Sequence, residues 1–158
     1  MIEIPLTQGQ VALVDNCDYQ TVAPFKWCAH NKRRKTFYAV GTESIGDGTF
    51  RTIKMHRVIL GVTDPAVWVD HIDGNGLNNC RSNLRICTRG QNQRNRPANR
   101  NNKSGYKGVF ACKRSGRWIA KIMCDRKAIH IGRFDTPEDA HAAYVQAAQS
   151  LHKEFSKS

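Results

Sequence analysis

An aspartate and a histidine stand side by side at positions 70 and 71, directly before a loop rich in glycine and asparagine. Carboxylate and amide oxygens suit Mg²⁺, which is commonly held by few protein oxygens together with a substrate phosphate. A neutral histidine, with an ordinary pKa of about 6.5, can take a proton from an attacking water. We therefore expect Asp70, together with the amide oxygen of Asn92 further along the chain, to bind Mg²⁺ or Mn²⁺. His71 would then act as the general base of phosphodiester hydrolysis.

Two strands and a loop are predicted around the Asp-His pair. Apolar alternation indicates one strand at 67–69 and another at 83–88, and the D-G and N-G dipeptides between them are signals of tight turns. Neighbouring residues of a regular strand point to opposite faces, so the first strand must twist or end at Asp70 and His71. Asn83 would stabilise the loop by bonding across it, because asparagine side chains readily bond loop backbone.

A helix is predicted to follow the second strand. Thr88 and Gln91 have the spacing of a capping box, so the helix should run from Arg89 until Pro97 ends it. Asn92 would lie about one turn into this helix and face back toward the strand pair. An isolated Asp-His dipeptide is more often an ordinary surface pair at a turn, so the chemical interpretation depends on this context.

Two segments of the chain closely resemble the HNH endonuclease family of the phage and intron homing type, and they read MHRVILG and VDHIDGNGLNNCRSNLRICTRGQNQRN. The predicted order of strand, strand and helix is part of this resemblance. The resemblance implies a ββα-metal motif in which His71 is the general base, the preceding Asp and the helix Asn bind the metal, and Asn83 orders the loop. Many members have His where this chain has Asn92. His56 also matches the homing pattern. Two roles are equally compatible with it, buried structural support and contact with a phosphate.

The distribution of charge indicates a polyanionic partner. The 158 residues carry a formal net charge of +12, and between Arg81 and Phe134 there are fifteen Lys and Arg with Asp125 as the only acid. Such a bias supplies sequence-independent affinity for nucleic acid. Charge alone leaves acidic lipid and acidic protein open, although no basic amphipathic helix is visible. The run 32–35, at an expected hairpin tip, fits a solvated surface and a phosphate contact equally well.

The N-terminal part predicts a small β unit. Short β-branched or aromatic runs are separated by Gly, Asp and Asn turns, and the runs are IEIPL, QVALV, FKWCAH, TFYAV and FRTIKMHRVIL.

Composition excludes other classes of protein and site. The six cysteines form no C-x-x-C pair, so no structural zinc site is expected. No apolar run approaches the roughly 20 residues that cross a bilayer, and the chain starts without a signal-peptide pattern. We therefore expect a cytoplasmic protein with no membrane partner.

The C-terminal part predicts a three-stranded sheet backed by a helix. After a polar linker at 97–104, three strand-like runs follow, with turns at 114–116 and 125–126. Thr136 and Pro137 then mark the start of a helix as N-cap and first helical residue. Its apolar stripe should pack against the sheet and consists of Ala140, Tyr144, Ala147 and Leu151.

The other face of this sheet would remain open, and antiparallel ribbons of this size can enter the major groove of DNA. The runs YKGV, GRWIAKI and IHIGRFDTPEDAHAAYVQAA resemble the apetala-two type DNA-binding domain, which implies contact with duplex DNA through the sheet. Phe110 and Cys112 stand where plant members usually have arginine, so base preference does not transfer, and a non-specific phosphate clamp is the alternative. The expected DNA contacts comprise two arginines of the helix predicted to begin at Arg89 and six residues of the C-terminal part. They are Arg89, Arg94, Lys107, Arg114, Arg117, Lys121, His130 and Arg133.

Together these features predict a two-domain α+β protein, with an HNH nuclease domain and its N-terminal β unit at 1–96, a linker at 97–104 and an apetala-two type domain at 105–158. The expected function is site-directed, metal-dependent DNA cleavage that leaves 5′-phosphate and 3′-hydroxyl ends, as the resemblance implies. A catalytically silent DNA-binding protein is the competing class, and an RNA-binding module would need exposed stacking aromatics on the sheet. No obligate protein partner is evident, and the target site and the number of strands cut stay open.

Overall fold

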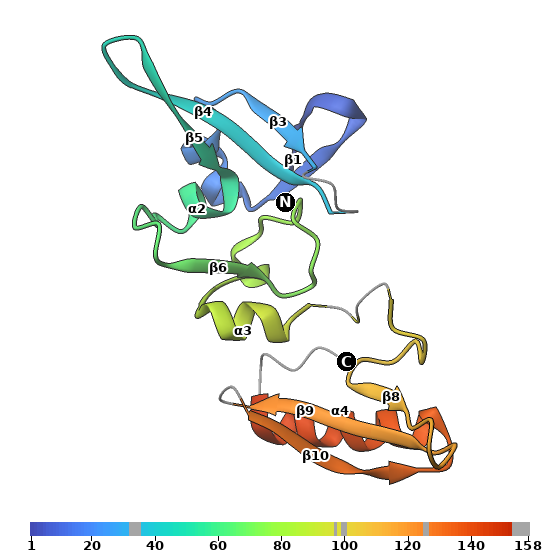
Figure 1. Ribbon diagram of the computed structural model, residues 1–158. Helices are drawn as coiled ribbons and strands as arrows, with labels where there is room; N and C mark the ends of the chain where they lie inside the picture. The colour runs from blue at the N-terminus through green and yellow to red at the C-terminus, as the bar shows by residue number, and fades with distance from the viewer. Residues whose placement is uncertain (32–35, 97, 99–100, 125–126, 153–158) are drawn as a thin grey trace. The chain divides into compact units, whose positions relative to one another are not determined.

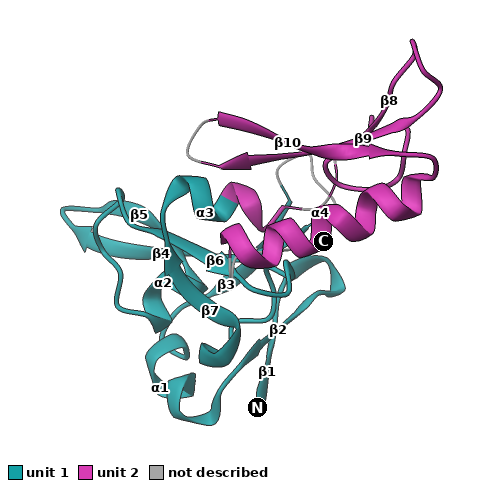
Figure 2. Cartoon of the chain, turned by 90° about the horizontal axis from the view of Figure 1, so that it is seen from below, with its two compact units in different colours: residues 1–92 teal, residues 93–158 magenta. Residues whose placement is uncertain are grey.

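The computed structural model describes residues 1–158 except 32–35, 97, 99–100, 125–126 and 153–158 (Figure 1). The chain divides into two compact units, Met1–Asn92 and Gln93–Ser158 (Figure 2). The described strands form small antiparallel sheets accompanied by few helices, so the predicted α+β class is confirmed. The predicted domain limits remain predictions, and the basic run at 32–35 and the turn at 125–126 lie outside the described residues.

The first unit begins with the predicted β-rich segment. One sheet pairs β1 (Ile2–Pro5) with β2 (Val11–Val14), and a second has the order β3 (Trp27–His30), β4 (Tyr38–Gly46) and β5 (Thr49–Lys54). The short helical turns between them are η1 (Thr7–Gly9), η2 (Asn16–Asp18) and α1 (Tyr19–Val22).

The prediction of one strand over FRTIKMHRVIL is wrong in its second half. The strand β5 ends at Lys54, and the helix α2 (Met55–Ile59) follows at once. Met55 and Ile59 are both buried, and residues four apart share one face of a helix. The β-branched residues in this run favour a strand locally, but burial of these two side chains in the core overrides that preference.

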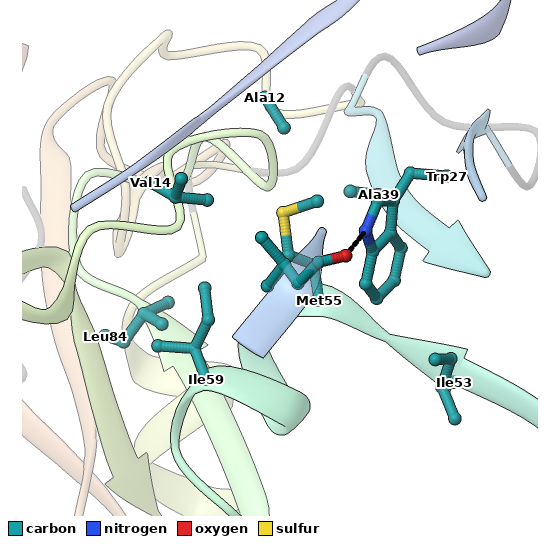
Figure 3. Close-up of a cluster of buried hydrophobic side chains, with 9 residues drawn as sticks. Ala12, Val14, Trp27, Ala39, Ile53, Met55, Ile59 and Leu84 are labelled. Atoms are coloured by element: carbon teal, nitrogen blue, oxygen red, sulfur yellow. Dashed lines mark hydrogen bonds between the residues drawn. The ribbon is translucent and has the colours of Figure 1, made fainter. Parts of the chain in front are cut away.

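The core of the first unit connects the N-terminal strands to the segment that carries the Asp-His pair. Met55 is fully buried at its centre, and the indole N–H of Trp27 donates to the Val22 carbonyl at 2.9 Å (Figure 3). Leu84 belongs to the same cluster, so burial anchors the second strand of the site to the rest of the unit. The buried cluster consists of Ala12, Val14, Val22, Trp27, Ala39, Ile53, Met55, Ile59 and Leu84.

The segment with the Asp-His pair has the order strand, loop, strand, helix. Its elements are β6 (Trp68–His71), η3 (Arg81–Asn83), β7 (Leu84–Cys87) and α3 (Arg89–Arg94). The strands are antiparallel, with Asp70 opposite Arg85. The capping box is confirmed, because the Thr88 N–H donates to Gln91 Oε1 at 2.7 Å and the Gln91 N–H donates to Thr88 Oγ1 at 3.2 Å.

The second unit contains a three-stranded antiparallel sheet with one helix along one face (Figure 1). The sheet has the order β10 (Lys127–Phe134), β9 (Trp118–Cys124) and β8 (Val109–Ala111), and the helix is α4 (Pro137–His152). The helix packs on the sheet through a cluster that includes Val109, Ile122 and Tyr144. Gly108 is required here, because an added Cβ would lie 2.2 Å from Tyr144 Cε2 and its φ is +74°.

The predicted stripe of α4 is wrong at its C-terminal end. The helix buries Ala140, Tyr144, Ala148 and His152, while Ala147 is half-buried and Leu151 is 41% exposed. The buried residues of α4 are spaced by four, which places them on one face of the helix. This spacing ends at His152, whereas the sequence predicted burial of the neighbouring Leu151. No helix among the described residues is both long and apolar enough to cross a lipid bilayer.

Candidate active site

Asp70 lies at the end of β6 and is only 7% exposed. Arg85 reaches it directly across the strand pair, with its Nη2 at 2.9 Å and its Nε at 3.1 Å from Asp70 Oδ2. The Arg85 side chain is itself 12% exposed, so the ion pair is largely removed from water. The sequence reading missed Arg85, although its position opposite Asp70 follows once the register of the two strands is known.

His71 ends the strand and is 5% exposed, so both members of the Asp-His pair are buried. Its Nε2 lies 3.3 Å from Oδ1 of the fully buried Asn79. The Asn79 Nδ2 donates to the Leu77 carbonyl at 3.0 Å, which sets the orientation of the amide. Asn79 Oδ1 can only accept, so the His71 Nε2–H is the donor and the neutral ring carries its lone pair on Nδ1.

Burial determines the charge state of this imidazole. It lowers the pKa of His71, while the hydrogen bond to Asn79 and the carboxylates of Asp73 and Asp70 oppose that shift. Since the net pKa lies below the ordinary value, His71 is neutral at neutral pH and can accept a proton.

Two further rings enclose His71. The ring centroid of His56, from α2, lies 4.9 Å from that of His71, and the centroid of Tyr38, from β4, lies 5.8 Å away. Burial, followed by electrostatic repulsion between protonated His56 and the neighbouring His71, Lys54 and Arg57 side chains, lowers the pKa of His56 to about 3. The His56 Nδ1 has no hydrogen-bond partner among the described residues. His56 is therefore a neutral packing neighbour of His71 in this structure, and Tyr38 is a neighbour that the sequence reading missed.

The loop after His71 is held by side-chain amides. The Asn83 Nδ2 donates to Asp73 Oδ1 at 3.0 Å and to the Asn78 carbonyl at 2.8 Å, and Asn83 Oδ1 accepts from the Asp73 N–H at 3.0 Å. Although burial alone would raise the pKa of Asp73, hydrogen bonds from Asn78, Asn75 and Asn83 lower it overall. These bonds give the loop one defined conformation and leave little freedom in the position of His71.

The same loop is attached to the N-terminal sheet. The Leu13 N–H donates to the Leu77 carbonyl and the Asn79 N–H donates to the Leu13 carbonyl, both at 2.8 Å. A Cβ on Gly76 would lie 2.4 Å from the Phe37 carbonyl oxygen, so no other residue fits there without movement. The N-terminal β unit therefore supports the loop that carries the Asp-His pair.

Asn92 lies half-buried in α3. Burial and the nearby Asp70 carboxylate raise the pKa of the Cys87 thiol, just before this helix, to about 11. The Asn92 backbone N–H donates to the Thr88 carbonyl at 3.0 Å. The residue that ends β7, two positions before α3, thus lies within electrostatic range of Asp70.

The donor set of this region suits a hard cation. Asp70 and Asn92 offer carboxylate and amide oxygens, the ligands that Mg²⁺ and Mn²⁺ accept together with water and phosphate oxygens. The described residues contain no group of three or more His, Cys, Asp or Glu that could hold a metal.

The expected DNA contacts fall into three places. Arg89 is exposed at the start of α3 and Arg94 is half-buried at its end. Lys121 and His130 are paired across β9 and β10, and Arg133 lies opposite Ile119 on the same sheet. Outside the sheet face, the ammonium of Lys107 donates to the Arg94 carbonyl, Arg117 Nε pairs with Asp135 Oδ1 at 2.7 Å, and Arg114 is exposed in a turn.

Comparisons with known proteins match both parts of the chain. The HNH endonuclease family matches residues 63–94, the range that contains the Asp-His pair and Asn92. The AP2 domain matches residues 104–154. The two matches place similarity to an HNH endonuclease before similarity to an AP2 domain along the chain. The HNH segment corresponds to β6, β7 and α3, and the AP2 domain corresponds to the sheet and α4 of the second unit.

Two viral proteins are similar over much of the chain. An uncharacterized HNH endonuclease of Acanthamoeba polyphaga mimivirus is 28% identical over 153 residues, which cover 94% of this chain and 74% of the relative. Protein 3.8 of Escherichia phage T7 is 28% identical over 107 residues, which cover 68% of this chain and 88% of the relative. No solved structure matches the chain. The HNH match and the name of the mimivirus relative support a nuclease role.

Proposed function

We propose that this protein is a metal-dependent homing-type endonuclease that hydrolyses a phosphodiester bond in duplex DNA, leaving 5′-phosphate and 3′-hydroxyl ends. The observation that supports the proposal best is the burial of Asp70 and His71 side by side at the end of β6. Two adjacent buried polar side chains are costly unless they are paired, and both are held by specific partners.

In this proposal the protein's own groups divide the work. His71 Nδ1 takes the proton of the attacking water, and the bond to Asn79 keeps the ring in the tautomer that can do so. Arg85 holds the carboxylate of Asp70 in place. Asp70 and Asn92 would bind Mg²⁺ or Mn²⁺, which when bound would stabilise charge developing on the phosphate and on the departing 3′ oxygen.

Duplex DNA is the proposed substrate because both matched segments belong to DNA-acting families and the AP2 sheet carries cations. We propose that this sheet directs the nuclease to a site. The phage T7 relative agrees with a phage origin, in which case the protein would act on DNA in the host cytoplasm.

A catalytically silent DNA-binding protein is the second candidate. One observation favours it: Asp70, a proposed metal ligand, is already paired with the buried Arg85. Incubation of the protein with supercoiled plasmid, in Mg²⁺ or in EDTA, separates the two functions. We expect relaxed or linear plasmid only with the metal and only when His71 is intact. Binding without any relaxation in Mg²⁺ or Mn²⁺ would support the silent protein instead.

A further inference from the structure

In the AP2 domain, α4 lies along one face of the sheet and does not cover the other face (Figure 2). Val109 and Ala120 are fully buried toward the helix, and successive residues of a strand point to opposite faces. Phe110 on β8 and Met123 on β9 therefore point away from the helix, and they are 54% and 56% exposed. Burial of an exposed phenyl side chain by a binding partner is energetically favourable.

The neighbours of Phe110 on this face are cationic or apolar. In register, Phe110 lies opposite Ile119, and Ile119 lies opposite Arg133. The next row along the sheet pairs Lys121 with His130. The described residues of β8, β9 and β10 include no Asp or Glu. The face thus combines an apolar side chain with positive charge, which fits a polyanion that also has apolar groups.

A basic groove borders the same residue. A cavity of about 710 Å³ in the second unit is lined by Phe110 together with Arg96, Lys103, Lys107 and Lys113, and its lining contains no Asp or Glu. A row of cations beside an exposed apolar side chain matches the way that proteins hold a DNA strand by its phosphates while other residues meet the base edges. The occupant of this surface that fits the charge is therefore duplex DNA.

We propose that Phe110 recognises the 5-methyl group of thymine in the major groove, with the basic groove holding the adjacent phosphates. This inference rests on the proposed DNA binding. A phenyl ring has no hydrogen-bonding group, so it cannot read the donors and acceptors of the bases. The thymine methyl is the apolar group that the major groove displays, and contact with it distinguishes thymine from cytosine.

Deoxyuridine provides the test because it differs from thymidine only by that methyl group. The full-length chain, in EDTA to prevent cleavage, is first used to select bound duplexes from a random library. Each thymine of the selected site is then replaced singly by deoxyuridine, and Kd is measured for every duplex. We expect the deoxyuridine replacement to raise Kd about fourfold at one or two thymines, because a change of about that size corresponds to the free energy of burying one methyl group.

The variant Phe110→Ala should bind the thymine and deoxyuridine duplexes equally at those positions. Two controls accompany it. Met123→Ala removes another exposed apolar side chain from the same sheet face and should leave the thymine-to-deoxyuridine ratio unchanged. Lys113→Ala removes a cation of the groove and should weaken binding to all duplexes alike, with a shallower dependence on salt.

The outcomes separate this inference from the proposed function. If no deoxyuridine effect depends on Phe110, the thymine contact is wrong while DNA binding stands. If the full-length chain retains no duplex at all, DNA binding and the thymine contact both fail, and the exposed face would belong to a protein partner. Circular dichroism of Phe110→Ala confirms that the exposed substitution leaves the fold intact.

Discussion

At the scale of single residues, the position of His71 depends on neighbours that lie far away in the sequence. Asn79 fixes its tautomer, and Tyr38 and His56 enclose its ring. Proton transfer by a positioned base typically contributes about 10²–10⁴-fold in rate, so His71→Ala should lose that factor in DNA cleavage while still binding DNA. The measurement is single-turnover nicking beside a gel-shift titration, with Ile72→Ala as the control at the exposed neighbour. Equal cleavage by His71→Ala at matched pH and metal would remove His71 from the role of base.

The proposed metal ligands give a second prediction at this scale. Asp70→Ala and Asn92→Ala should each raise the Mn²⁺ concentration needed for half-maximal cleavage, because each removes an oxygen ligand. Asn92→His should retain more activity than Asn92→Ala, since imidazole is also a metal ligand. The same loss in both Asn92 variants would argue against ligation at that position.

His56 should make folding sensitive to acid. Its folded pKa of about 3 lies below the unfolded value of 6.5, so the unfolded chain binds the proton first as pH falls. Stability is therefore full above pH 6.5 and declines between pH 6.5 and 3, by as much as roughly 4–5 kcal/mol from this group. His56→Phe keeps a ring but cannot titrate, so its urea midpoint should fall less across that range. Parallel pH profiles for both proteins would contradict the burial of a neutral His56.

At the scale of elements, the helix α3 depends on a local signal at Thr88. Loss of an N-cap hydrogen bond costs about 1 kcal/mol, so Thr88→Ala should loosen the first turn of α3 and with it the position of Asn92. Cleavage should fall while DNA affinity is kept, and Thr88→Ser, which retains the hydroxyl, should restore most of it. Nicking rates and thermal melting of the three proteins test this, and unchanged cleavage in Thr88→Ala would mean that this end of α3 contributes nothing to the site.

Elements with short-range signals could be predicted from the sequence, and contacts across the fold could not. The capping box and the D-G and N-G turns place α3 and the loop, because their hydrogen bonds join residues close in the sequence. The helix α2 was missed because its β-branched run favours a strand until Met55 and Ile59 enter the core. Arg85, Tyr38 and the amide of Asn79 come to Asp70 and His71 only through strand pairing and loop packing.

At the scale of the whole molecule, the chain forms two compact units, Met1–Asn92 and Gln93–Ser158. The units divide after Asn92, but α3 continues to Arg94, so a cut after residue 98 keeps the helix of the HNH segment whole. The AP2 side of such a cut keeps the bonds from Asn102 and Ser104 to the Tyr106 carbonyl, and the bond from Lys107 to the Arg94 carbonyl then joins the two pieces. The side chains of Asn102 and Ser104 therefore belong with the AP2 domain, although the sequence places both residues in the linker.

Cutting the chain after residue 98 should therefore separate chemistry from targeting. The piece 1–98 keeps Asp70, His71 and Asn92, so we expect it to nick DNA in Mg²⁺ at higher enzyme concentration and at less restricted positions. The piece 99–158 should bind duplex DNA with a strong salt dependence and cut nothing, because it holds the cations of the sheet but none of these groups. Mapped nick positions for the first piece and salt-dependent binding for the second decide between the outcomes. If the truncated nuclease cuts the same sites with undiminished affinity, the AP2 domain is not a targeting module, and its basic sheet face must serve another partner.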